Sequence, residues 1–182
     1  MPPLDLRPWG LHPLLEGNVR ALDAEFPNLL TVLSGFRDLR RQCYAMASNA
    51  SLNRNWLTVT YTRQDRPSYG LAQRLQHALN AQPEVTSIKD ITELFLTELE
   101  AAPLGTLISW HTFRLLDTPA SLAVDFAPIF LPHMTSLDPV CDRIRSFAAT
   151  LPHYDAFLFK EGGLIRFHYQ IYPATLRPVQ QV

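Results

Sequence analysis

The sequence has no apolar run near the ~20 residues that a helix needs to cross a bilayer, so no membrane span is expected. It has only two cysteines, Cys43 and Cys141, far apart and at apolar positions of predicted helices, so two buried free thiols are expected. It also lacks an excess of one charge, since 16 basic residues stand against 17 acidic ones. This balance gives no general attraction to nucleic acid or to an anionic membrane.

The first residues lack the basic and apolar regions of a signal peptide. We therefore expect synthesis in the cytoplasm, where thiols stay reduced. Association with a virion, or release to the cell wall through lysis, needs no signal peptide, so both destinations stay open.

The composition favours a well-packed protein. With 182 residues, of which 47% are hydrophobic and 18% charged, the chain suits a single domain over residues 1–182. Fifteen prolines against seven glycines indicate many rigid turns. Residues 1–13 are predicted to form an extended arm that lies on another surface, including that of a partner subunit. Residues 173–182 are predicted to form a surface-laid tail.

Hydrophobic spacing places helices early and strands late in the chain. Helices are predicted over 13–26, 69–81 and 87–101, through Leu39, Cys43 and Met46, and from Asp138 to Leu151. Strands are predicted over 29–33, 56–61, 107–115, 121–126, 156–160 and 164–172, with polar loops over 48–55 and 62–68. This order predicts the α+β class, with helices packed on a mostly antiparallel sheet.

Two of the six histidines, His111 and His168, fall on predicted strands. In the last strand, alternation puts His168 on one face with Arg166, Gln170 and Tyr172. Such a face suits the wall of a site, and an ordinary solvated sheet face is the alternative.

His111 and Asp125 lie on the two arms of the predicted 107–126 hairpin. An odd-numbered loop would put their side chains about 5 Å apart on one face. A two- or four-residue loop would separate them. With His168 they would make a zinc set of two imidazoles and one carboxylate, with one position left for water.

Three short motifs, in order over residues 31–172, resemble the zinc D-Ala-D-Ala carboxypeptidase and peptidoglycan endolysin superfamily. Ser34-Gly-Phe-Arg37 resembles the "SGYR" turn between a strand and a helix. Ser121-Leu-Ala-Val-Asp125 resembles the second half of S-x-H-x-x-G-x-A-x-D, and Phe167-His168-Tyr-Gln170 resembles the end of "DxPHFQ".

The resemblance implies a D-Ala-D-Ala peptidase-like fold and a zinc ion held by His111, Asp125 and His168. It implies that Arg37 stabilises a substrate carboxylate or a developing oxyanion. The sequence departs from the family at two places. Thr118 occupies the usual position of the first zinc histidine, and Ile165 that of the acidic general base, for which Glu161 is the nearby candidate.

Three functions follow. The chain is expected to hydrolyse peptidoglycan stem peptides if it is an active enzyme. Alternatively, it is a non-catalytic member that binds the cell wall or other protein subunits, as a structural component of a phage or secretion assembly. The third alternative is an unrelated α+β protein with a small-ligand pocket.

Overall fold

The computed structural model describes residues 4–62, 68–102, 108–112, 114–115, 118–128, 138–161 and 164–173. The chain divides into two compact units, one made of residues 1–36 and 117–177 and the other of residues 37–116 and 178–182. The single-domain expectation stays a prediction. Among the described helices, none has the length and apolar character that a membrane crossing requires.

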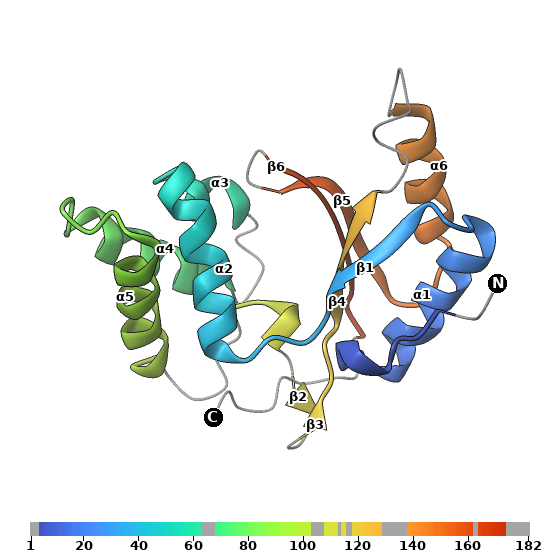
Figure 1. Cartoon of the computed structure of the whole chain (residues 1–182), viewed down its shortest axis with the longest axis horizontal. Helices are drawn as coiled ribbons and strands as arrows, with labels where there is room; N and C mark the ends of the chain where they lie inside the picture. The colour runs from blue at the N-terminus through green and yellow to red at the C-terminus, as the bar shows by residue number, and fades with distance from the viewer. Residues whose placement is uncertain are drawn as a thin grey trace. The chain divides into compact units, whose positions relative to one another are not determined.

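The first unit contains a four-stranded antiparallel sheet in the order β1-β4-β6-β5 (Figure 1). Its strands are β1 (Leu30–Ser34), β4 (Ala123–Pro128), β6 (Leu164–Ile171) and β5 (Tyr154–Glu161). The hairpin predicted between the last two strands is confirmed. With the helices, this sheet confirms the predicted α+β class.

One face of this sheet is apolar and is covered by α1 (Pro13–Glu25) and α6 (Asp138–Ala148), which lie side by side (Figure 1). Phe126 pairs with Phe167 and Val124 with Tyr169, and all four side chains are fully buried. Burial of large apolar groups here supplies the main driving force for folding of this unit.

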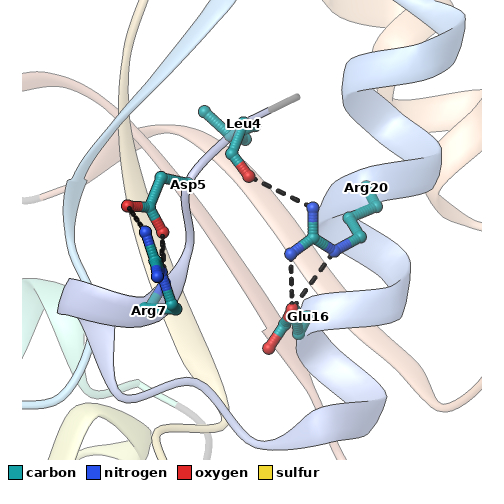
Figure 2. Close-up of polar contacts among 5 residues, drawn as sticks. All are labelled: Leu4, Asp5, Arg7, Glu16 and Arg20. Atoms are coloured by element: carbon teal, nitrogen blue, oxygen red, sulfur yellow. Dashed lines mark hydrogen bonds and ion pairs between the residues drawn. The ribbon is translucent and has the colours of Figure 1, made fainter. Parts of the chain in front are cut away.

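The N-terminal arm packs on its own unit, and it is not wholly extended as predicted. Residues Arg7–Trp9 form the 3-10 helix η1, and the Trp9 carbonyl accepts a hydrogen bond of 2.7 Å from the Phe36 N–H. Figure 2 shows the Arg20 guanidinium of α1 bound to the Leu4 carbonyl and to Glu16. The arm therefore has a binding surface within its own chain.

The second unit is mainly helical, with α2 (Leu39–Leu52), α3 (Trp56–Thr60), α4 (Ser68–Asn80), α5 (Ile88–Glu100) and the 3-10 helix η2 (Trp110–Thr112). Its core includes Cys43, Leu75 and Phe95, each fully buried. Burial raises the pKa of the Cys43 thiol to about 12. Cys141 in the first unit is also buried and unbridged, so the prediction of two buried free thiols is confirmed.

The strand predicted over residues 56–61 is wrong. Residues Trp56–Thr60 form helix α3, in which Trp56 and Leu57 are both buried. Two adjacent buried positions do not suit a half-exposed strand, so packing overrides the β propensity of this stretch. Helix α2 also continues into the predicted 48–55 loop as far as Leu52.

The predicted 107–126 hairpin is wrong as well. His111 lies in η2, and among the described residues from 108 to 119 the strand pairing joins β2 (Arg114–Leu115) to β3 (Thr118–Pro119). Asp125 instead pairs with Ser34 of β1 and His168 of β6. The predicted 62–68 loop mostly lies outside the described residues, although Ser68 begins α4. Of the predicted tail, only Pro173 is described.

Candidate metal centre

Asp125 and His168 occupy facing positions on the central strands β4 and β6. Both side chains are buried, and the His168 Nδ1 lies 2.9 Å from the Asp125 Oδ1. The alternation of each strand explains the placement, because the flanking residues Phe126 and Phe167 point to the opposite, apolar face. The prediction that His168 lies on the polar face of its strand agrees with this arrangement.

A chain of hydrogen bonds fixes the orientation of the His168 ring. Its Nε2 lies 2.9 Å from the Oε1 of Gln170, and the Nε2 of Gln170 donates to the Oδ2 of Asp155. Since the amide nitrogen faces the carboxylate, the amide oxygen faces the ring, and the ring nitrogen beside it carries the proton. The opposite nitrogen, Nδ1, is then the ring atom directed at Asp125.

This arrangement places an imidazole nitrogen and a carboxylate oxygen together in a buried site. With its proton on Nε2, a neutral His168 directs a lone pair from Nδ1 at a negatively charged oxygen. A cation between the two atoms removes this repulsion, and the cation is either a second ring proton or a metal ion bound to both atoms. The donor set therefore fits a metal ion as well as it fits a charged histidine.

His111 joins the other two predicted ligands. One ligand atom from each of His111, Asp125 and His168 lies within 4.8 Å of the others, and all three residues are buried. The hairpin predicted to bring His111 to Asp125 does not form: His111 lies in η2, Asp125 in β4 and His168 in β6. Two imidazoles and one carboxylate are the donors that zinc accepts in sites that keep one coordination position open.

The other two predicted site residues have different surroundings. Arg37 donates its backbone N–H to the His111 carbonyl at 2.8 Å, and its guanidinium donates to the Gln42 Oε1 at 3.3 Å. Glu161 is the last residue of β5 and pairs with Leu164, whereas His168 pairs with Leu158. Glu161 lies three positions beyond Leu158, about 10 Å along the backbone.

Residues that support the site were only partly visible in the sequence. The alternation of the last strand predicts Gln170 on the same face as His168, but it does not predict the hydrogen bond from Gln170 to Asp155. Asp155 falls at an irregularity of β5, between the pairs Tyr154–Ile171 and Ala156–Gln170. Such an irregularity re-aims a side chain, and the alternating pattern of the sequence does not show it.

Comparison with known proteins gives no further guidance: no protein-family model, no curated protein and no solved structure matches this chain.

Proposed function

We propose that this chain binds a zinc ion through His111, Asp125 and His168 and hydrolyses the stem peptides of peptidoglycan. The observation that carries the proposal is the buried group of three ligands, with ligand atoms within 4.8 Å of one another. Three donors from three separate elements serve a metal ion better than a proton, which needs only two. The resemblance of the motifs around Arg37, Asp125 and His168 to zinc peptidases supplies the substrate class.

The contacts of His168 support this assignment. Histidines that bind metals almost always donate their second ring N–H to a carboxylate, a carbonyl or water, which fixes the tautomer and the ring orientation. Gln170 and Asp155 provide this support for His168. A zinc ion in such a site polarises a carbonyl and lowers the pKa of a bound water.

Metal content tests the centre directly. The purified chain, loaded with zinc and then dialysed, is expected to retain about one ion per chain by mass spectrometry of the metal. Asp125→Asn keeps the shape of the side chain but removes its charge, and we expect more than 100-fold weaker zinc binding, beyond the ~10–100-fold cost of losing a supporting group. Asp142→Asn, on the exposed side of α6, is the matched control and retains the ion. Equal zinc binding by the Asp125→Asn variant and the native chain contradicts the centre.

Cleavage is tested separately, on purified peptidoglycan with the zinc-loaded chain. New stem-peptide fragments, seen by mass spectrometry and lost in His168→Asn but kept in the exposed α4 variant His77→Asn, are the expected result. A chain that holds zinc yet releases no fragments contradicts hydrolysis and leaves the metal centre in place.

A second candidate function is a non-catalytic module that binds the cell wall, or other subunits of a phage or secretion assembly. It is favoured by Ile165, which stands where the resembled family has its general base, and by the distance of Glu161 along β5 from the strand position facing His168. A general base must reach the reacting proton directly or through one water. Co-sedimentation with peptidoglycan without cleavage supports this candidate over hydrolysis.

A further inference from the structure

Three polar side chains form a row across neighbouring strands of the sheet. Ser34 of β1 pairs with Asp125 of β4, and Asp125 pairs with His168 of β6. Facing residues of antiparallel strands point to the same side, with their Cβ atoms about 4.5–5.5 Å apart. Ser34 therefore lies beside Asp125, on the flank opposite His168.

A bulge in β1 creates this row. Val32 pairs with Phe126 and Ser34 with Asp125, so Leu33 has no facing residue on β4. Without the extra residue, an unbroken ladder would place Leu33 opposite Asp125. Instead Leu33 is 54% exposed, and the hydroxyl-bearing residue occupies the position next to the candidate metal ligand.

The Ser34 hydroxyl is buried, and within the described part of the chain its oxygen has no hydrogen-bond partner. Burying a hydroxyl without a partner costs free energy, so such groups in proteins call for a reason. The hydroxyl is not used to support Asp125, and it remains able to donate to an oxygen atom of a bound molecule.

The residues after Ser34 hold it in place. A Cβ atom at Gly35 would collide with the Trp9 carbonyl, so no larger residue fits there without movement of the backbone. The same carbonyl accepts the Phe36 N–H at 2.7 Å. The chain directly beyond Ser34 is thus fixed against the N-terminal arm, which holds the backbone of this turn in place.

We infer that Ser34 is a ligand-positioning residue of the candidate centre: its hydroxyl donates a hydrogen bond to the oxygen atom of a carboxylate or peptide carbonyl that binds at the metal's open position. This inference rests on the proposed metal site. It predicts that the centre prefers oxygen ligands to sulfur ligands, because an oxygen atom accepts the Ser34 hydrogen bond well and a sulfur atom accepts it poorly.

The test uses the full chain loaded with cobalt(II), whose visible absorption changes when an added ligand binds. Ser34→Thr and Ser34→Val have nearly the same shape and differ in the hydroxyl. Acetate is expected to bind Ser34→Thr as tightly as the native chain, and Ser34→Val about 10-fold more weakly, as the loss of one bond to a charged group predicts. Ethanethiol is expected to bind all three equally, and Thr31→Ala, at an exposed position of β1, serves as the control.

Each outcome bears on a different claim. Equal acetate affinity in the Thr and Val variants overturns the role of Ser34 while the bound cobalt upholds the metal centre. Equal weakening of acetate and ethanethiol in Ser34→Val also overturns it, because that result describes a general disturbance of the site. A native chain that binds no cobalt overturns the proposed centre and the inference together.

Discussion

The two faces of the β1-β4-β6-β5 sheet carry opposite kinds of side chain, although neighbouring residues build both. Phe126 and Phe167 face α1 and α6, whereas the adjacent Asp125 and His168 face the other way. Both faces are buried at these strands, yet only one is apolar. The two faces therefore differ in what they contribute. The apolar face stabilises the unit, whereas the polar side chains of the other face cost stability when buried unless they bind an ion or make hydrogen bonds.

The largest expected effect is on the apolar face. Phe167→Ala removes a fully buried ring that packs edge-on against Phe157 and Phe159, and we expect a loss of about 3–5 kcal/mol in the free energy of unfolding. Urea denaturation measures it. Leu158→Ala, at a half-exposed position facing His168, is the control and should change stability by only about 0.5 kcal/mol. Similar losses for both variants would show that the apolar face does not contribute more to stability than the polar face.

The next effect is on the polar face and concerns metal affinity. Gln170→Leu removes the amide that orients His168, and we expect about 10–100-fold weaker zinc binding by chelator competition. The control is Gln76→Leu, a buried glutamine of the helical unit, which should leave zinc affinity unchanged. Unchanged affinity in Gln170→Leu would show that His168 needs no orienting partner.

A smaller effect is expected from a polar contact on the apolar face. The Asn18 side-chain amide donates to the Tyr169 hydroxyl at 2.8 Å, and burial raises the pKa of that hydroxyl to about 12. Tyr169→Phe removes the bond and should cost about 1 kcal/mol of unfolding free energy. Tyr44→Phe, at an exposed position of α2, should cost nothing measurable by the same denaturation.

The smallest effect is a pH dependence at the start of α1. His12 caps this helix by accepting the Leu14 N–H through Nδ1, and burial, aided by the charge of His153, lowers the pKa of His12. The unfolded chain then binds the proton more readily. The contribution of neutral His12 is complete above the unfolded pKa of ~6.5 and is lost as the pH falls toward the lower folded pKa.

His12→Asn keeps a capping oxygen but does not titrate, so stability should fall less between pH 7.5 and pH 5 than in the native chain. Denaturation across that range measures the difference, with the exposed His77→Asn as the control. If the native chain and the His12→Asn variant showed the same pH dependence of stability, titration of His12 would not contribute to it.

The strands with clear alternation could be predicted from the sequence. Residues 164–172 alternate between apolar and polar, which gave the face of His168, and Gly162-Gly163 marked the hairpin. The helix from Pro13 was equally clear, because a proline starts it and apolar residues recur at helical spacing. In these segments the local conformational preference of the residues and their burial agree, so the hydrophobic pattern is sufficient to predict the secondary structure.

The rest depended on contacts that a linear pattern does not contain. Trp56–Thr60 is rich in β-branched and aromatic residues, yet two neighbouring positions are buried and the segment is helical. His111, one of the candidate ligands, lies in a 3-10 helix, whereas the sequence pattern predicts a strand there. Ser34 stood within the recognised turn motif, but only the bulge beside it shows which residue faces Asp125.

That bulge also sets how the chain can change in length. Leu33 and Ser34 together occupy the span that Asp125 alone occupies on β4. Deleting Leu33 would leave the serine opposite Asp125 in an ordinary ladder. Deleting Ser34 instead would bring Leu33 or Gly35 to that place, and neither has a hydroxyl. Strand β1 therefore keeps a hydroxyl opposite Asp125 when Leu33 is deleted and loses it when Ser34, the next residue, is deleted.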